Sequence, residues 1–147
     1  MNIGISSDHR GYEIKKELIN KLTEKGYNIT DCGTDNSDSV DYPVYAFKLC
    51  ELVTKHQIDF GIAICGTGIG MSIACNKVKG IRCAKIDNVI DTKYAKEHNN
   101  ANILAISANK SLEEIIEMIE IFINNSFSSN EKHQRRIQLI EDYENAN

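Results

Sequence analysis

Short apolar runs alternate along this chain with longer segments in which apolar residues recur every three or four positions. The short runs are typical of buried strands, and the longer segments are typical of amphipathic helices. The pattern predicts strands over residues 2–6, 28–31, 60–64, 81–86 and 102–107. It predicts helices over residues 11–25, 42–56, 71–77, 88–97, 112–123 and 131–143.

Strands that alternate with helices predict one α/β domain over residues 1–147. We expect a five-stranded parallel sheet with helices on both faces and a further helix at the C-terminal end. Ligands of such sheets bind beyond the carboxyl ends of the strands, near a switch in strand order. Reactive side chains that directly follow a strand are therefore the first candidates for a functional site.

The segment with the most chemical content follows the third predicted strand. That strand leads into Cys65, and Gly66, Gly68 and Gly70 come next at alternate positions. Glycine lets the main chain approach a ligand closely, and amides at the start of a helix favour negative charge. No Walker lysine closes the loop, and Met71 stands where a dinucleotide fingerprint has its last glycine. The pattern favours an anion site, either a phosphate cradle or an oxyanion hole, over a turn without a ligand.

Cys65 itself has two interpretations, which the residues alone leave open. A lone cysteine is usually a buried structural residue, whereas a thiol near a helix start can be stabilised as the reactive thiolate. The chain has five cysteines, and no two of them form a Cys-x-x-Cys pair. The odd number and the spacing argue against a disulfide framework and against a zinc ribbon.

Candidate side chains also follow the first strand and stand near two helix ends. Asp8 and His9 can bind a sugar hydroxyl and a phosphate, or can cap a helix and face solvent. Tyr42 either packs against the core or lines the site. His98 opens a polar stretch that suggests a ligand loop, although a histidine there can also cap a helix.

A basic group opens the last predicted helix, where the helix dipole favours anions instead. This local mismatch suggests a phosphate grip, with a solvated basic face as the alternative. The group consists of Lys132, His133, Arg135 and Arg136.

Composition narrows the function classes. The formal net charge of −4 argues against a general nucleic-acid binder. The first residues lack the basic and apolar regions of a signal peptide, and no apolar run approaches the length of a membrane span. We expect a soluble cytoplasmic protein without nucleic-acid or membrane partners.

Six motifs occur in a specific order along nearly the whole chain. They are Asp8-His9, Asp41-Tyr-Pro43, Cys65-Gly-Thr-Gly-Ile-Gly70, Asn76-Lys-Val-Lys-Gly-Ile-Arg82, His98-Asn-Asn-Ala-Asn-Ile103 and His133-Gln-Arg-Arg-Ile137. Together they resemble the family of ribose-5-phosphate isomerase type B, which also holds the galactose-6-phosphate isomerase subunits.

The resemblance implies reversible isomerisation of D-ribose 5-phosphate and D-ribulose 5-phosphate, a reaction of the pentose phosphate pathway, through an enediolate. It implies no metal and no organic cofactor. It also implies a three-layer Rossmann-like fold that works as a homodimer or a dimer of dimers, with active sites shared between subunits.

By position, Cys65 resembles the base that moves the proton between C1 and C2, and Thr67 and His98 resemble the pair that opens the furanose ring. The residues and the resemblance together lead us to expect ten substrate-binding positions. They are Asp8, His9, Tyr42, Gly66, Gly68, Ile69, Gly70, Asn99, Lys132 and Arg136.

Two positions depart from the family pattern. Lys132 and Asn109 stand where the family often has arginine, and lysine keeps the charge but loses the planar fork. Arg135 and Lys110 are the candidates to compensate. Other interpretations are an allose-6-phosphate or galactose-6-phosphate isomerase, a non-catalytic nucleotide-binding module, and a thiol redox sensor centred on Cys65.

Overall fold

The computed structural model describes residues 1–147, and its elements follow the predicted alternation of strands and helices. The strands are β1 (Asn2–Ser7), β2 (Asn28–Asp31), β3 (Phe60–Cys65), β4 (Cys83–Lys85) and β5 (Ile103–Ser107). The helices are the short 3₁₀ turn η1 (His9–Gly11), α1 (Tyr12–Glu24), α2 (Tyr42–Thr54), α3 (Ile69–Cys75), α4 (Val89–Glu97), α5 (Leu112–Asn124) and α6 (Glu131–Ala146).

The five strands form one parallel sheet in the order β2-β1-β3-β5-β4. The chain passes from β1 to β2 on one side and then returns to place β3 on the other side of β1. The switch in strand order therefore lies between β1 and β3. Because ligands of parallel sheets bind at such a point, the topology directs attention to the residues that follow these two strands.

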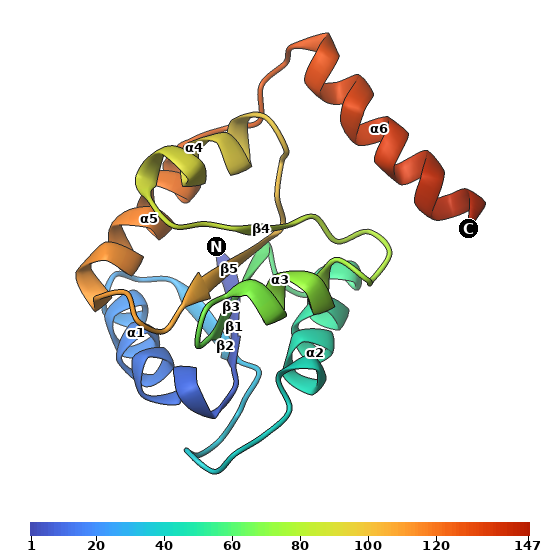
Figure 1. The fold of residues 1–147 in the computed structure, drawn as a ribbon. Helices are drawn as coiled ribbons and strands as arrows, with labels where there is room; N and C mark the ends of the chain where they lie inside the picture. Colours follow the sequence, from blue (N-terminus) through green and yellow to red (C-terminus); the bar gives the residue numbers. More distant parts are fainter.

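Alternation along the central strands separates the core into two layers. Ile62 and Ile64 of β3 join the cluster that α1, α4 and α5 cover, whereas Ala63 and Cys65 join the cluster that α2 and α3 cover. Successive strand residues point to opposite faces, so each face receives its own apolar set. Figure 1 shows these two groups of helices on either side of the sheet. The predicted three-layer α/β fold is confirmed.

Several predicted element ends differ from the structure. Helix α2 ends two residues earlier than predicted, and α6 ends three residues later. Strand β4 covers three residues instead of residues 81–86, and asparagine side chains accept from the main-chain amides at its start. Asn102 Oδ1 accepts from the Arg82 amide at 2.8 Å, and Asn76 Oδ1 accepts from the Cys83 amide at 2.8 Å. Helix α3 begins at Ile69, two residues earlier than predicted, because Gly68 adopts a φ of 80° and serves as its N-cap.

Helix α6 stands apart from the layered body in Figure 1 and is joined to it by an extended segment after α5. Ile137 is its only buried residue. Leu139 and Tyr143 lie one turn apart on α6, with 61% and 72% of their surfaces exposed. Two large apolar side chains therefore remain exposed on this helix.

Candidate functional site

The switch point brings the ends of β1 and β3 side by side. Ser7 pairs with Ile64 in the sheet, and the Asp8 amide donates to the Ile64 carbonyl at 3.2 Å. Asp8 and Cys65, the residues that come directly after these partners, therefore lie at the same edge. The structure places these two predicted site residues at the location that the strand order favours.

The sulfur of Cys65 accepts a hydrogen bond from a main-chain amide of the glycine loop. The Gly68 N–H donates to Cys65 Sγ at 3.2 Å, and the residue is 5% exposed. The Gly68 amide therefore points at the sulfur of a side chain that is almost fully buried at this end of the strands.

Two other cysteines have environments that favour the neutral thiol. Burial, with a contribution from nearby Asp31, raises the pKa of Cys32 to about 11. A hydrogen bond to Cys75, together with burial, raises the pKa of Cys50. All five cysteines are free.

The three glycines of the glycine loop, residues 66–70, lie close to other parts of the chain. A Cβ atom on Gly68 would lie 3.1 Å from the carbonyl carbon of Ile106, and one on Gly70 would lie 2.7 Å from the ring of Tyr42. The Ser107 hydroxyl donates to the Gly66 carbonyl at 2.8 Å and ties the loop to the end of β5. The ring of Tyr42 thus lies beside the loop.

The turn after β1 is held by the carboxylate of Asp8. Its Oδ1 accepts from the amides of Arg10 and Gly11 at 3.0 and 3.2 Å. The Val40 amide donates to Nδ1 of His9 at 3.2 Å, so the proton of the neutral imidazole lies on Nε2. His9 therefore offers a hydrogen-bond donor at this edge.

Thr67 is exposed at the turn of the glycine loop. Its Oγ1 accepts from the Ile69 amide at 3.2 Å, which fixes the side chain while leaving its own proton free to donate. The carboxyl ends of the strands thus gather six predicted site positions besides the glycines. They are Asp8, His9, Tyr42, Cys65, Thr67 and Ile69.

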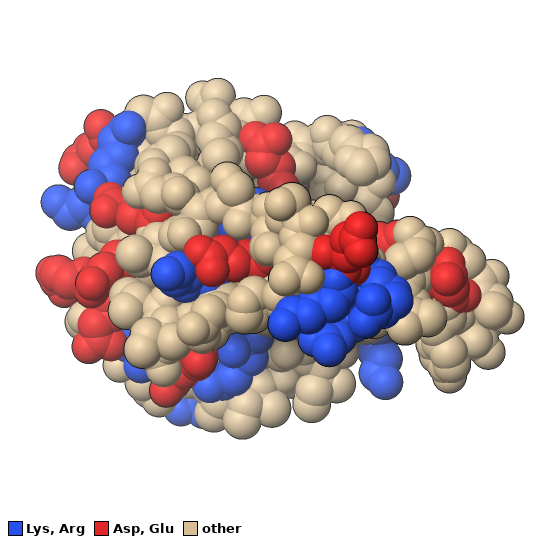
Figure 2. All heavy atoms as spheres, turned by 90° about the horizontal axis from the view of Figure 1, so that it is seen from above, with Lys and Arg blue, Asp and Glu red and all other residues tan.

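A second cluster forms where α4 ends and α6 begins. The His98 ring stacks between Tyr94, at 4.5 Å, and His133, at 4.2 Å between ring centroids. Loss of water contact, together with the charges of His98, Lys132 and Arg136, lowers the pKa of His133. Figure 2, which views the molecule from this end, shows Lys and Arg side chains gathered in one patch. Lys132, Arg135 and Arg136, in the first two turns of α6, are all exposed.

The two clusters lie at opposite ends of the parallel strands. Strand β5 starts at Ile103, opposite Gly61, and ends at Ser107, opposite Cys65. His98 and Asn99 precede β5, so the length of this strand alone, about 13 Å, separates them from the thiol end. Within one chain, the structure does not bring His98, Asn99, Lys132 or Arg136 to Cys65.

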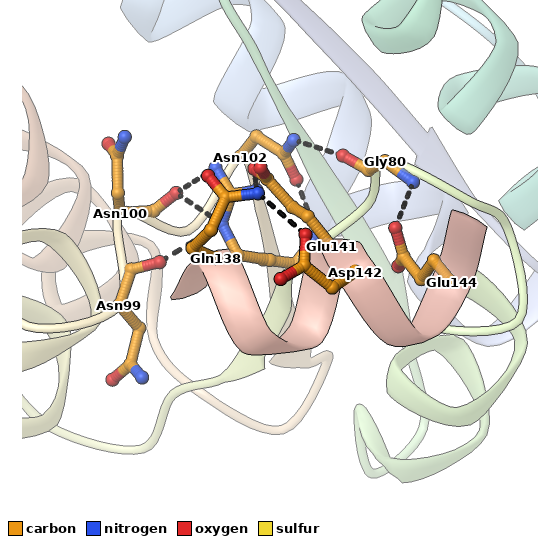
Figure 3. Close-up of polar contacts among 9 residues, drawn as sticks. Gly80, Asn99, Asn100, Asn102, Gln138, Glu141, Asp142 and Glu144 are labelled. Carbon is orange, nitrogen blue, oxygen red and sulfur yellow. Dashed lines mark hydrogen bonds and ion pairs between the residues drawn. The ribbon is translucent and has the colours of Figure 1, made fainter. Parts of the chain in front are cut away.

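Arg82 organises the second cluster, a role that sequence reasoning missed. Its guanidinium donates to the carbonyl of Asn99 at 3.1 Å and to that of Asn100 at 2.9 Å, and it reaches Glu141 on α6 at 3.4 Å. Figure 3 shows these asparagines beside α6, where the Glu144 carboxylate also accepts from the Gly80 amide. The motif that contains Arg82 was a signal, but only the fold reveals its partners.

The hollows of the single chain lie away from Cys65. One of about 440 Å³ lies beneath α6, between Arg82, Asn99 and Ile140, and none of the hollows is lined by the glycine loop. No hollow of the single chain therefore reaches Cys65, which is 5% exposed. No three His, Cys, Asp or Glu side chains come together as a group that could hold a metal ion. None of the helices combines the length and apolar character needed to cross a lipid bilayer.

The family model described as Ribose/Galactose Isomerase matches residues 3–140. The chain belongs to this family. A Bacillus subtilis relative, whose name says sugar phosphate isomerase and specifies no sugar, is 44% identical over all of this chain and 99% of its own length. A Listeria innocua relative named ribose-5-P isomerase B is 36% identical, with 100% and 99% of the two chains covered.

Solved structures of family members have the same fold. The Clostridium thermocellum ribose-5-phosphate isomerase B superposes with a TM-score of 0.95 at 40% identity, covering 99% of each chain. The Mycoplasma genitalium ribose-5-phosphate isomerase B, solved with bound ribulose-5-phosphate, superposes with a TM-score of 0.93 at 38% identity, covering 99% of this chain and 97% of its own. The protein is thus a sugar phosphate isomerase of this family.

Proposed function

We propose that the protein interconverts D-ribose 5-phosphate and D-ribulose 5-phosphate through an enediolate. The pentose is supported most directly by the family member from Mycoplasma genitalium, which binds ribulose-5-phosphate on the same fold. The chemistry is supported by a thiol at the switch point, with a main-chain amide directed at its sulfur. The allose 6-phosphate and galactose 6-phosphate reactions remain the alternatives within the family.

Cys65 is the proposed base. It removes the proton from the carbon next to the carbonyl and returns it to the neighbouring carbon, so that an aldose becomes a ketose. A general base of this kind contributes about 10²–10⁴-fold to the rate. Its sulfur lies at the carboxyl end of β3 and contacts the Gly68 amide at 3.2 Å, at the start of the loop that is proposed to hold the substrate oxygen.

The glycine loop is the proposed site for the enediolate oxygen. The first amides of a helix have no partner within the helix. At the start of α3, the Ile69 amide donates to Thr67 Oγ1, and the amide of the N-cap residue Gly68 donates to Cys65 Sγ. The Gly70 amide, one residue further, is the proposed donor to the developing negative charge, which it can stabilise without reorganisation.

A second copy of the chain is proposed to complete each site. The phosphate-binding candidates Lys132 and Arg136 and the ring-opening candidate His98 lie at the edge opposite Cys65, so one chain offers only half of the constellation. Apolar residues are exposed beside the glycine loop as well as on α6. Those beside the loop are Val44, Phe47, Ile69 and Ile73, each between 47% and 56% exposed. Two copies can cover both surfaces and bring the halves together.

In this homodimer, Lys132 and Arg136 of one chain bind the phosphate of a sugar held by the other chain. His98 and Thr67 assist the opening of the furanose ring, and Asp8, His9, Tyr42 and Asn99 bind the sugar. Remote binding of the phosphate fixes C1 and C2 over the thiol, which turns binding energy into rate. We place the enzyme in the cytoplasm, where five unpaired cysteines stay reduced.

The proposal is tested by initial rates on ribose 5-phosphate, allose 6-phosphate and galactose 6-phosphate. We expect the highest kcat/KM on ribose 5-phosphate. Cys65→Ala is expected to lower kcat about 10²–10⁴-fold, while Cys32→Ala, which removes a thiol with a raised pKa, serves as the matched control.

A preference for a hexose phosphate would replace the pentose assignment. Retention of most of the activity by folded Cys65→Ala would remove the thiol from its proposed role.

A further inference from the structure

Arg10 lies directly against the glycine loop, although no motif of the sequence drew attention to it. A Cβ atom on Gly66 would lie 2.9 Å from both Cζ and Nη1 of Arg10 and 3.0 Å from Nε. The guanidinium group thus covers the residue that follows Cys65. The main chain of Arg10 is fixed because its amide donates to the Asp8 carboxylate at 3.0 Å.

Arg10 differs from the other cations that stand at or near the strand ends. Lys15 contacts Asp31 at 2.6 Å, Lys85 contacts Asp87 at 3.9 Å, and Lys110 contacts Asp87 at 3.2 Å. The guanidinium of Arg10 has no carboxylate within 4.0 Å and makes no side-chain hydrogen bond in the chain. It is an uncompensated positive charge at the switch point of the sheet.

His9, the neighbour of Arg10 on the same turn, offers a second donor. Because the Val40 amide occupies Nδ1, the Nε2–H of the neutral ring is available. The short turn η1 therefore carries two adjacent hydrogen-bond donors, the imidazole N–H of His9 and the guanidinium group of Arg10. A guanidinium can bind a phosphate through two parallel N–H···O bonds, which adds geometric selectivity to charge.

We infer that Arg10 binds the phosphate group of the substrate from the thiol-bearing chain. This inference rests on the proposed function for the identity of the substrate, but its anion-binding part does not depend on turnover. In the proposed dimer, the phosphate lies between Arg10 on one chain and the α6 cations of the other chain. The residue contacts the ground-state anion and takes no part in moving the proton between C1 and C2.

The test combines kinetics with direct binding of inorganic phosphate. Arg10→Met removes the charge but keeps an unbranched stem, and Arg10→Lys keeps the charge but loses the planar fork. Loss of a charge-assisted hydrogen bond is expected to raise KM for ribose 5-phosphate by about 10- to 100-fold in Arg10→Met. Any fall in kcat should accompany this rise in KM, because phosphate binding also positions C1 and C2 over the thiol. Arg10→Lys is expected to fall between Arg10→Met and the original enzyme.

Lys16→Gln is the matched control, since it removes one positive charge from an exposed position on the adjoining helix. Isothermal titration with inorganic phosphate should show binding to the original protein and to Lys16→Gln, and at least tenfold weaker binding to Arg10→Met. A structural role for Arg10 would lower kcat or the melting temperature in Arg10→Met without weakening phosphate binding selectively.

The outcomes separate this inference from the proposed function. An unchanged KM and unchanged phosphate affinity in Arg10→Met, with an active original enzyme, would overturn the role of Arg10 and leave the isomerase assignment intact. A protein that fails to turn over ribose 5-phosphate, yet loses phosphate affinity in Arg10→Met, would overturn the pentose assignment and support the role of Arg10. A fall in kcat with unchanged KM would also count against phosphate binding.

Discussion

Gly68 meets three requirements at a single residue. Its φ of 80° starts α3, its amide contacts the sulfur of Cys65, and its Cα lies against the main chain of Ile106. Only a residue without a side chain meets the first and third requirements together, because a Cβ atom is disfavoured at positive φ and would also lie 3.1 Å from a backbone carbon. The backbone conformation of Gly68 thus directs the amide that contacts the Cys65 sulfur.

Gly68→Ala is therefore expected to cost more than the same change at a positive-φ glycine in open space. Gly26 supplies that control, because its φ is 95° and no atom lies within 4 Å of its Cβ position. We expect Gly26→Ala to lower the free energy of unfolding by about 1 kcal/mol, and Gly68→Ala to lower it by about 1–3 kcal/mol more. Urea unfolding of both variants measures the difference, and equal costs would contradict the proposed close packing.

At the residue scale, the sequence is most informative where a residue type has few uses. Cys65 and the glycines could be singled out because a thiol and alternate glycines after a buried strand are unusual together. Arg10 could not, because an arginine on a polar turn is ordinary until the fold lays its guanidinium over Gly66. Placement in space, rather than residue type, carries the interpretation there.

At the scale of elements, α6 is the least embedded part of the chain. Its contacts with the body include one buried side chain, Ile137, and the polar contacts of Glu141 and Glu144 with Arg82 and Gly80. Leu139 and Tyr143 remain on its exposed surface. We expect α6 to gain the rest of its packing from a second copy of the chain.

Leu139→Glu combined with Tyr143→Glu should therefore change assembly more than folding. Both side chains are mostly exposed in the single chain, so each substitution alone costs it within about 0.5 kcal/mol. Buried together at an interface, the two carboxylates would be strongly unfavourable. Analytical ultracentrifugation should report a dimer or larger species for the original protein and a monomer with native circular dichroism for the variant. Gln134→Glu on the same helix is the control, and an unchanged mass for the double variant would exclude α6 from the interface.

The elements themselves were largely predictable, whereas their exact ends were not. The predicted helix over residues 112–123 matches α5 closely, and the Ser111 hydroxyl caps its start by accepting from the Glu114 amide at 3.2 Å. The short β4 was misjudged because side chains of Asn76 and Asn102 replace strand partners, a tertiary effect that periodicity does not record. Strand order also depends on such contacts between distant segments, so the sequence indicated a switch point without locating it.

At the scale of the whole molecule, the predicted site residues fall into two groups at opposite ends of the parallel strands. Cys65 and Thr67 stand at the carboxyl edge, and His98 and Arg136 stand near the other. The residues of both groups could be predicted from the sequence, because each lies in a recognisable motif. The distance between the two groups could not, because it depends on how β5 runs within the folded sheet.

Mixing two inactive variants tests whether the groups meet across a dimer. Cys65→Ala removes the proposed base and His98→Asn removes the proposed ring-opening histidine. If each site takes Cys65 from one chain and His98 from the other, one site of a mixed dimer carries both substitutions and the other site carries neither. Co-refolding the two chains in equal amounts should restore about a quarter of the original activity, because half of the dimers are mixed and each has one intact site. A chain that carries both substitutions should restore nothing with either partner. Failure of the single variants to complement would show that each site is built from one chain.

The opposed edges also have a consequence for how the enzyme behaves on dilution. If each reaction centre needs two chains, turnover per milligram must fall when the protein is diluted below the dissociation constant of the pair, even though every monomer keeps its α/β core. The loss would be reversed by concentrating the sample, which distinguishes it from denaturation. Substrate that bridges the two chains would oppose the loss, so a saturating sugar phosphate would extend the working range to lower enzyme concentrations.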